Sequence, residues 1–267
     1  MAASVFKFLY LDRDPSANPG EASKRHQYSI SSLNKSQLWM SSFDKFNDPY
    51  EVRFQHALAE SLDEVKGGLE FLCFISPLQF EPAWRSLVKE CGYDRQNIIT
   101  RFNQNYIPSG LEKRLRTMFG AVSMATEFNS VLMWAHYCNQ HTGICIEFDH
   151  EKLIANSPQL KCGSVNYVDS NKLPIYKAAD FRKISLDETI KNIFTTKHQL
   201  WEYEQEWRLI TVNPNSQLTF PDDAVIRVIL GPFIDEKAEA QVREICGIKD
   251  WVVVQSGFSE DKYEITC

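Results

Sequence analysis

The segment Trp201–Arg208 concentrates charge and aromatic rings at the start of an apolar run. It holds three glutamates, one arginine, two tryptophans and one tyrosine, and the mainly apolar stretch Leu209–Val212 follows directly. Apolar and β-branched side chains favour pleated structure, so the sequence predicts a β-strand over Trp207–Val212. Charged side chains at the mouth of a strand are held by a rigid element and can be aimed at a ligand. The same pattern is also typical of a strand end whose acids point to solvent, so both interpretations stand.

An extended backbone would sort these side chains onto two faces, because alternate residues of a strand point to opposite sides. One face would be acidic and would share its parity with Arg208: Glu202, Glu204 and Glu206. The other face would hold the rings that keep the acids in place: Trp201, Tyr203 and Trp207. Crowded carboxylates raise one another's pKa, which suits acid–base catalysis or cation binding. We expect Glu204, Glu206 and Arg208 to be the working part of a candidate site.

The composition is that of an ordinary globular chain of 267 residues, with 43% apolar and 24% charged residues. A net charge of -6 and a pI near 5.6 argue against a protein that coats nucleic acid non-specifically. No apolar run approaches the roughly 18 residues that a membrane helix needs, and the N-terminus lacks the features of a secretory signal. Seven irregularly spaced cysteines fit a reducing compartment. The sequence thus predicts a cytoplasmic protein without a membrane association.

Hydrophobic periodicity and turn signals predict an α+β fold. Strands are expected at 5–11, 37–41, 119–124, 144–148, 164–168, 207–212, 225–230, 251–255 and 263–266. Helices are expected at 25–33, 81–91, 94–106, 109–118, 131–138, 151–155, 185–197 and 235–246. The strand–helix–strand order between 225 and 255 predicts a local parallel pair. We expect one domain over 1–267, with mixed, largely antiparallel sheets and a helical insertion at about 59–118.

Several residues mark the expected helix ends. Ser130 and Asp149 are expected to cap the helices that follow them. Ser185 and Glu188 have the spacing of a capping box, in which each side chain bonds the backbone N–H of the other residue. Gly247 is expected to end the helix before it, because glycine readily adopts the left-handed conformation that follows a helix.

Three polar residues near the N-terminal strands have two interpretations each. Lys7 interrupts an apolar strand, either as an edge-strand gatekeeper or as a buried cation that answers the glutamates. Asn47 and Asp48 precede a proline, a combination typical of an Asx turn. In the functional alternative, Asn47 and Asp48 belong to a substrate site.

Trp134, His136 and Tyr137 bring three polar-tipped aromatic side chains into four residues. They are either packed in the core, or they stack on a ring and donate hydrogen bonds to a ligand. His136 and His141 lack the spacing of a zinc-protease helix, and the chain has no CxxC pair. No metal site is therefore predicted.

Three stretches carry a combined motif. They are Leu38-Trp-Met-Ser-Ser with Phe46-Asn-Asp-Pro-Tyr-Glu51, Leu132-Met-Trp-Ala-His-Tyr137 with Gly143-Ile-Cys-Ile-Glu-Phe148, and Trp201-Glu-Tyr-Glu-Gln-Glu-Trp-Arg208. In order and rough spacing they resemble a widespread bacterial family, the domain of unknown function numbered 2971. Phe6-Lys-Phe8 resembles the first strand of that family, which usually reads Tyr-Lys-Tyr. The helical block before Phe119 departs from the compact members.

Glu204-Gln-Glu206 is also similar to the acid-x-acid motif that opens a late strand in ADP-ribosyltransferases. That resemblance implies catalytic roles, with Glu206 holding the ribose of NAD beside the oxocarbenium-like centre and Glu204 serving the acceptor. Lys7 would take the early basic position, where that class more often has Arg or His. Ser41 or Tyr137 would supply the middle motif. The fold would then be ADP-ribosyltransferase-like, and NAD would be a substrate.

Three functions are therefore expected in turn. The first is an NAD-using, ADP-ribosyltransferase-like enzyme with a nucleotide ligand. The second is a non-enzymatic binding or sensor module in bacterial defence or stress, whose acids and rings bind a cationic or ring-bearing partner. The third is a metal-dependent nucleic-acid-processing enzyme whose acids hold Mg²⁺. A shared site requires that Lys7, His136 or Tyr137, and Glu206 converge on one cleft.

Overall fold

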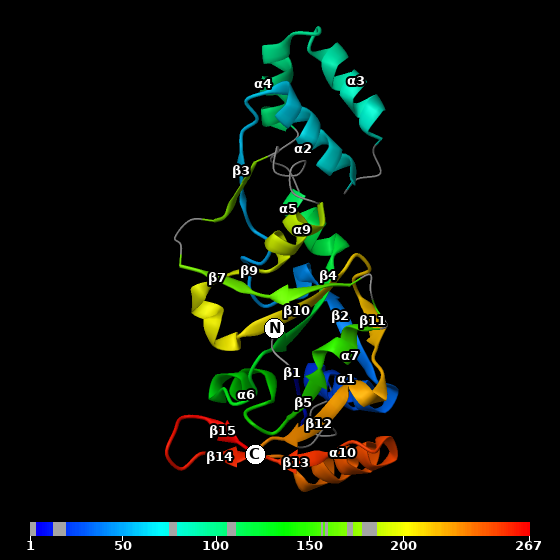
Figure 1. The fold of residues 1–267 in the computed structure, drawn as a ribbon, viewed down its shortest axis with the longest axis vertical. Coiled ribbons are helices and arrows are strands. Elements are labelled where there is room, and N and C mark those ends of the chain that lie inside the picture. Colours follow the sequence, from blue (N-terminus) through cyan, green and yellow to red (C-terminus); the bar gives the residue numbers. More distant parts are fainter. Residues whose placement is uncertain are drawn as a thin grey trace.

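The computed structural model describes residues 4–12, 20–74, 79–105, 111–155, 157, 160–169, 173–177 and 186–267. Its elements are spread along one long axis (Figure 1). A helical layer lies at one end, a large sheet lies in the middle, and α10 (Glu236–Lys249) lies at the other end beside β14 (Gly257–Phe258) and β15 (Ile265–Thr266). Within the described ranges, every helix is too short or too polar to cross a bilayer.

Nine strands of the described chain form the central sheet. They are β1 (Ser4–Leu9), β2 (Gln37–Ser42), β4 (Gly120–Ala125), β5 (Ile144–Asp149), β6 (Lys161–Ser164), β10 (Glu206–Thr211), β11 (Ser216–Thr219), β12 (Val225–Leu230) and β13 (Val253–Gln255). Neighbours run antiparallel except β12 and β13, which are parallel because α10 crosses over between them. The predicted α+β class, with a mixed and largely antiparallel sheet, is confirmed.

The strand that carries the candidate site is held on both sides. β10 pairs with β4 along its full length and with β6 on its other edge. The other edge of β4 pairs with two strands in succession. β1 pairs with it at Ala125, and β2 pairs with it at Ala121 and Gly120. β10 is therefore an internal strand, and its backbone cannot shift without breaking two ladders.

Both faces of the sheet are covered, and the side chains of β5 alternate between two cores. Ile144 and Ile146 point toward the core under α10 and α1 (Glu21–Lys35), whereas Cys145 packs toward α6 (Val131–Tyr137). Burial on both faces explains the apolar run Ile144–Ile146. The buried Glu147 that follows is paired with Arg227, whose Nε lies 2.6 Å from its Oε2.

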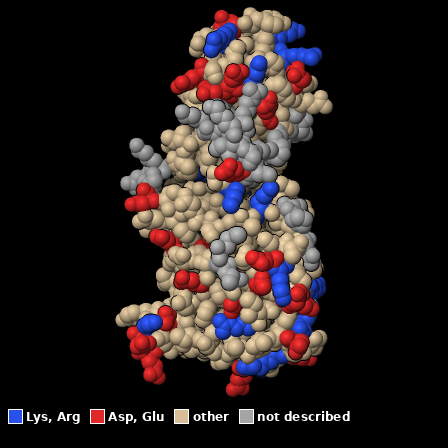
Figure 2. Space-filling model, viewed as in Figure 1, with Lys and Arg blue, Asp and Glu red and all other residues tan. Residues whose placement is uncertain are grey.

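The helical end has a core of its own. Its helices are α2 (Leu62–Phe74), α3 (Phe80–Glu90) and α4 (Arg95–Asn105), and α5 (Leu111–Met118) connects them to the sheet. Leu69, Leu87 and Phe102 are buried between α2, α3 and α4. Acidic and basic side chains are mixed over the visible face of this end (Figure 2). The helices predicted at 81–91, 94–106 and 109–118 correspond to α3, α4 and α5, and residues 106–110 lie outside the described ranges.

Short parallel pairs complete the fold around the candidate site. They are β3 (Gln55–Ala57) with β8 (Ile175–Lys177), and β7 (Asn166–Val168) with β9 (Thr196–His198). The strand predicted at 164–168 is divided between β6 and β7. The helix predicted at 185–197 is α9 (Leu186–Phe194), which ends early because Lys197 pairs in β9. Ser185, the predicted cap, lies outside the described residues.

The other predicted caps can be compared directly. Ser130 Oγ accepts a hydrogen bond from the Met133 N–H at 3.4 Å, as expected at the start of α6. Asp149 Oδ1 accepts from the Glu151 N–H at 3.0 Å at the start of α7 (His150–Ala155). Both caps are confirmed.

The predicted end of α10 at Gly247 is wrong. The helix continues through Gly247 to Lys249, and Asp250 takes the left-handed conformation with φ of 56°. Asp is one of the few residues that reach this region by hydrogen bonding locally. Gly247 therefore sits inside the helix, where glycine is unfavourable.

A tight turn joins α6 to β5. Asn139, Gln140 and His141 have φ values of 47°, 54° and 71°, a left-handed run that is rare for residues with side chains. Gly143 follows, and a Cβ added there would lie 2.2 Å from the Leu9 carbonyl oxygen. The turn thus brings the backbone of Gly143 against β1 at a distance that only glycine permits.

Replacing Gly143 by Ala should lower the free energy of unfolding by about 2 kcal/mol, because overpacking forces the backbone of β1 to move. Gly247→Ala is the matched control, since a Cβ there meets nothing within 4 Å and removing a mid-helix glycine should stabilise by about 0.5–1 kcal/mol. Urea unfolding followed by circular dichroism measures both. A Gly143 variant as stable as the wild type would contradict the packing described for this turn.

Candidate functional site

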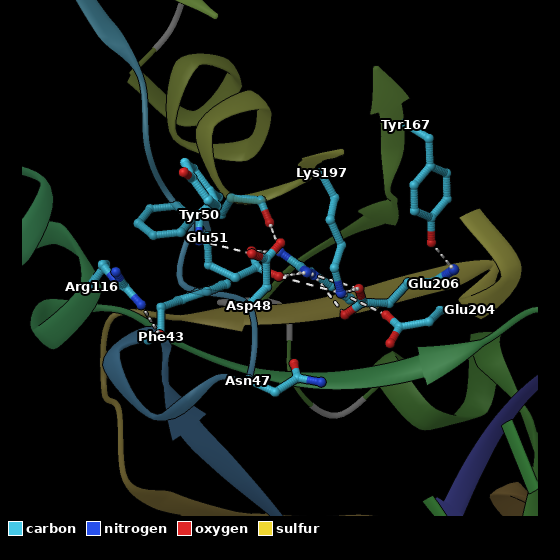
Figure 3. Close-up of polar contacts among 12 residues, drawn as sticks. Phe43, Asn47, Asp48, Tyr50, Glu51, Arg116, Tyr167, Lys197, Glu204 and Glu206 are labelled. Carbon is cyan, nitrogen blue, oxygen red and sulfur yellow. Dashed lines mark hydrogen bonds and ion pairs between the residues drawn. The ribbon is translucent and has the colours of Figure 1, made fainter. Parts of the chain in front are cut away.

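A buried ionic cluster lies where β9, β10 and the loop after β2 meet (Figure 3). We define the ionic cluster as Glu51, Lys197, Glu204, Glu206 and Arg208, all of which are buried.

Lys197 is the centre of this cluster. Its Nζ lies 2.6 Å from Glu204 Oε2, 3.2 Å from Glu206 Oε2 and 3.5 Å from Glu51 Oε1. Burial alone would lower the pKa of Lys197, but these three acids hold it above its ordinary value. The ammonium is therefore permanently charged near neutral pH. The Trp201 ring covers it, with the ring centroid 4.7 Å from Nζ.

Arg208 is completely buried and uses every donor it has. Nε and Nη2 donate to the two carboxylate oxygens of Glu206 at 2.7 and 2.8 Å. Nη1 and Nη2 donate to the two oxygens of Glu51 at 2.9 and 2.6 Å, and Nη1 also donates to the Phe194 carbonyl at 2.7 Å. A guanidinium has five N–H groups, so none remains for a ligand. The expected ligand-binding role of Arg208 is replaced by that of a clamp between two carboxylates.

Glu206 is held as an anion. Burial would raise its pKa, but the charges and hydrogen bonds of Arg208, together with Lys197, lower it to about 2. Its backbone N–H donates to the Tyr167 hydroxyl at 2.8 Å. The expectation that crowded acids raise one another's pKa does not apply to Glu206, because two cations, Arg208 and Lys197, lie among these acids.

The backbone before β10 is not extended, which corrects the expected acidic face. Gln199–Glu204 form a 3₁₀ helix, η2, and Gln205 follows with φ of 43°. Glu202 is exposed, whereas Glu204 is buried. The left-handed turn at Gln205 brings Glu204 and Glu206 to one ammonium, and Glu202 remains outside.

The three rings of the segment also have different surroundings. Trp207 is buried in the main core, and Tyr203 packs against the core under α6, as predicted. Trp201 does not join either core. It covers Lys197 and lines a surface pocket.

The loop after β2 delivers Glu51 to the cluster. Asp48 Oδ1 accepts from the Tyr50 N–H at 2.8 Å, and the Asp48 carbonyl accepts from the Glu51 N–H at 3.2 Å. The Asx-turn interpretation of Asp48 is thus confirmed. Val52 has φ of 59°, a conformation that is strained for a β-branched residue. The bonds of Glu51 to Arg208 hold the loop in this strained shape.

Tyr137 and Asn47 extend the cluster to the surface. The Tyr137 hydroxyl donates to Glu204 Oε1 at 2.5 Å, and Asn47 Nδ2 donates to the Tyr137 hydroxyl at 3.2 Å. Burial and the neighbouring Glu204 carboxylate raise the pKa of Tyr137, so the hydroxyl keeps its proton. Tyr137 and Asn47, two of the predicted ligand-binding residues, are therefore linked to the predicted acid Glu204 by hydrogen bonds within the protein.

Lys7 is a buried cation and not an edge gatekeeper, because β1 lies inside the sheet. Its Nζ donates to the Ser123 carbonyl at 2.8 Å, beside the gap where β4 passes from β1 to β2. Burial lowers the pKa of Lys7 to about 8, and the charge of Glu206 opposes that change. Lys7 thus contributes to the field around Glu206.

Three other predicted residues lie apart from the cluster. Ser41 pairs with Ala121 in the sheet, and no hydrogen bond joins it to the ionic cluster within the described part of the chain. Trp134 is fully buried, and its Nε1 donates to the Phe128 carbonyl at 2.6 Å, so its observed role is core packing. His136 is exposed and its Nδ1 lies 3.3 Å from the Tyr203 hydroxyl.

A pocket of about 380 Å³ opens beside Lys197 and Trp201. Its apolar walls come from the end of β7, from the residues just before β8 and from η2: Val168, Leu173, Pro174 and Leu200. Its polar groups come from the loop after β2 and from β9: Asp48, Arg53 and His198. The pocket and the ionic cluster therefore share Lys197, which has its ammonium among the acids.

A metal ion has no evident place here. Over the described residues, no group of three or more His, Cys, Asp or Glu side chains could hold one. The three carboxylates of the ionic cluster converge on Lys197 Nζ, so an internal ammonium takes the place that a bound cation would take.

Two members of the cluster were not among the predicted site residues. Glu51 is the last residue of the Phe46–Glu51 motif, and Lys197 stands four positions before Trp201, where the charged segment begins. The signal that could have found them is charge balance: three acids that share a buried site with one arginine need a further cation.

Replacing Arg208 by Met should lower the free energy of unfolding by about 3–5 kcal/mol, because it leaves Glu51 and Glu206 as buried charges without their main partner. Arg243→Met is the control, since Arg243 forms an exposed pair with Glu239 that contributes about 0.5 kcal/mol or less. Chemical unfolding of both variants checks this. Similar losses in the two variants would contradict a clamp at Arg208.

The depressed pKa of Glu206 also predicts a pH dependence. Its folded pKa of about 2 lies below the ordinary value of 4.5, so its contribution to stability is present above pH 4.5 and is lost as the pH falls toward 2. The loss should be about 3 kcal/mol for a shift of this size. Unfolding free energies measured from pH 5 to pH 2 should fall less steeply in Glu206→Gln than in wild type. Equal slopes would contradict the assignment to Glu206.

A match to a known protein family lies in the middle of the chain. Residues 133–209 match the model of a family described as Protein of unknown function (DUF2971). The matched range includes most of α6, all of β9 and η2, and the first residues of β10. No curated protein and no solved structure matches the chain. The similarity thus covers the segments that supply Tyr137, Lys197, Glu204, Glu206 and Arg208 to the site.

Proposed function

We propose that the protein is a binding module whose pocket, beside Lys197, takes a small planar ligand that carries a negative charge. The observation that carries this proposal is the pocket of about 380 Å³, in which a tryptophan ring and apolar walls lie next to the exposed Arg53. Pockets of this kind, mostly apolar with a few placed polar groups, are typical of small-molecule sites.

Trp201 offers the ligand a ring that is already fixed. Lys197 Nζ lies 4.7 Å from the ring centroid, and three carboxylates hold that ammonium in place. Because the ring is held before binding, little conformational entropy is lost when a planar ligand stacks on it. This arrangement supports binding of an aromatic or heteroaromatic group.

The rim of the pocket favours an anion. Arg53 is exposed, and its guanidinium lies 5.1 Å from the centroid of the Tyr50 ring. Neither an ion pair nor a hydrogen bond joins the Arg53 side chain to another residue in the described ranges, so its guanidinium can donate to a ligand. His198 Nδ1 accepts from the Leu200 N–H at 3.1 Å, which puts the proton of a neutral imidazole on Nε2. Both groups therefore supply hydrogen-bond donors.

The same geometry favours binding over group transfer. In the transferase alternative, Glu206 would contact the ribose of NAD, but both Glu206 oxygens accept hydrogen bonds from Arg208. Glu204 Oε1 accepts from Tyr137, and Oε2 accepts from Lys197. Both acids are buried among these partners, so a ribose could reach either acid only if the surrounding side chains moved. Binding of Mg²⁺ for nucleic-acid processing would likewise require displacement of Lys197.

Calorimetric titration with naphthalene-1-sulfonate, a planar anion that fits the pocket, tests the proposal. We expect saturable one-to-one binding that Trp201→Ala weakens by about tenfold, the effect of losing one stacking ring. Phe258→Ala is the control, because Phe258 is exposed and lies in β14, at the far end of the molecule (Figure 1).

Two outcomes would overturn the proposal. One is the absence of saturable binding, and the other is equal binding by the Trp201 and Phe258 variants. NAD in the same experiment should release no nicotinamide. A release that Glu206→Gln abolishes would favour the transferase instead.

A further inference from the structure

We infer that the ligand of this pocket is a free ribonucleoside 5′-monophosphate, with its base on Trp201, its ribose hydroxyls on Asp48 and its phosphate on Arg53. This inference rests on the proposed function and adds the chemical class of the ligand. The three side chains line one cavity, and the protein's own contacts leave part of their binding capacity unused.

The size of the cavity favours one nucleotide. A volume of about 380 Å³ is near the lower end of the range for ligand pockets, roughly 300–1,000 Å³. A base and a ribose fill such a space, whereas two joined nucleotides exceed it. The phosphate would lie at the rim, where the exposed side chains of Tyr50 and Arg53 are found.

Asp48 supplies the acceptor. Its side chain is buried and lines the pocket, and its Oδ1 accepts one hydrogen bond from the Tyr50 N–H. An ionised carboxylate has about four lone-pair positions and no donor, so capacity remains for donors from a ligand. The two hydroxyls of a ribose are neutral donors of this kind. A cationic ligand fits less well, because the guanidinium of Arg53 lines the same pocket.

Arg53 supplies the anion partner. A guanidinium is planar and presents a fork of donors that matches the oxygens of a phosphate. The guanidinium lies over the Tyr50 ring. Arg53 therefore loses less conformational freedom when it binds an anion. The neighbouring His198 lines the pocket as well and adds one donor from Nε2. Together they favour a phosphate over a neutral polar group.

Trp201 does not select a particular base. Stacking on an aromatic ring is similar for every base, because each has a π-face. The side chains of Val168, Leu173 and Pro174, which form the apolar walls, have no hydrogen-bonding groups for base edges. The selectivity of the site should therefore come from the phosphate and the ribose, and several bases should bind with similar affinity.

Calorimetric titrations with AMP, 2′-deoxyAMP and adenosine separate these contributions. Wild-type protein should bind AMP about tenfold more tightly than either analogue. Arg53→Gln should weaken AMP binding about tenfold and leave adenosine unchanged. Asp48→Asn should remove the preference for AMP over 2′-deoxyAMP, while its Oδ1 still accepts from the Tyr50 N–H.

Arg243→Gln is the matched control, because this exposed arginine lies on α10 and away from the pocket. Urea unfolding of each variant shows whether the fold is kept. If naphthalene-1-sulfonate binds but AMP does not, the nucleotide inference is overturned and the proposed function stands. If neither binds, both fail. AMP binding that is insensitive to Arg53→Gln and Asp48→Asn also overturns the inference.

Discussion

A guanidinium without access to water must have all five of its N–H groups accepted by the protein. Arg208 meets this condition with two carboxylates and one carbonyl. Its partners come from three elements: Glu51 in the loop after β2, Phe194 at the end of α9, and Glu206 at the start of β10. The acids that Arg208 holds are two of the three that surround Lys197. The positions of Glu51 and Glu206, and through them that of Lys197 beside the pocket, therefore depend on one fully bonded arginine.

The pocket and the ionic cluster are built from the same backbone segments, which send some side chains to the pocket and others to the cluster. In the loop after β2, Glu51 points to Arg208 while Asp48 and Arg53 line the pocket. In the segment that leads to β10, Glu204 belongs to the cluster and Trp201 lines the pocket. Buried ion pairs contribute little net stability but strongly oppose alternative arrangements of the groups they join. Here they give the pocket walls a fixed shape before a ligand arrives.

The sequence predicted most of the secondary structure, because hydrophobic periodicity reflects which faces are buried. The fold class, the parallel pair of β12 and β13, and the caps at Ser130 and Asp149 follow from local patterns. A shared site was expected to join Lys7, His136 or Tyr137, and Glu206. Tyr137 reaches Glu204 beside Glu206, and Lys7 is close enough to feel the charge of Glu206, whereas His136 contacts Tyr203.

The remaining features depend on partners that are far apart in sequence. Lys197 belongs to β9 and not to a helix because β7 pairs beside it, and no local pattern shows that pairing. Glu51 lies 157 positions before Arg208, so the match of carboxylate and guanidinium is visible only in the folded chain. The left-handed Gln205 has no sequence signal of its own, since glycine is the usual residue there.

The residues of the loop after β2 differ in how strongly the fold constrains them, and this affects how such a site can diverge in evolution. Glu51 is fixed by Arg208, but Tyr50 is 59% exposed and Leu200, on the other side of the pocket, is 77% exposed. Substitutions at such exposed positions usually change stability by less than about 0.5 kcal/mol. The rim is therefore free to vary under selection while the base of the pocket is not. Related chains with the same buried cluster would be able to exchange one ligand for another by changing only a few surface side chains.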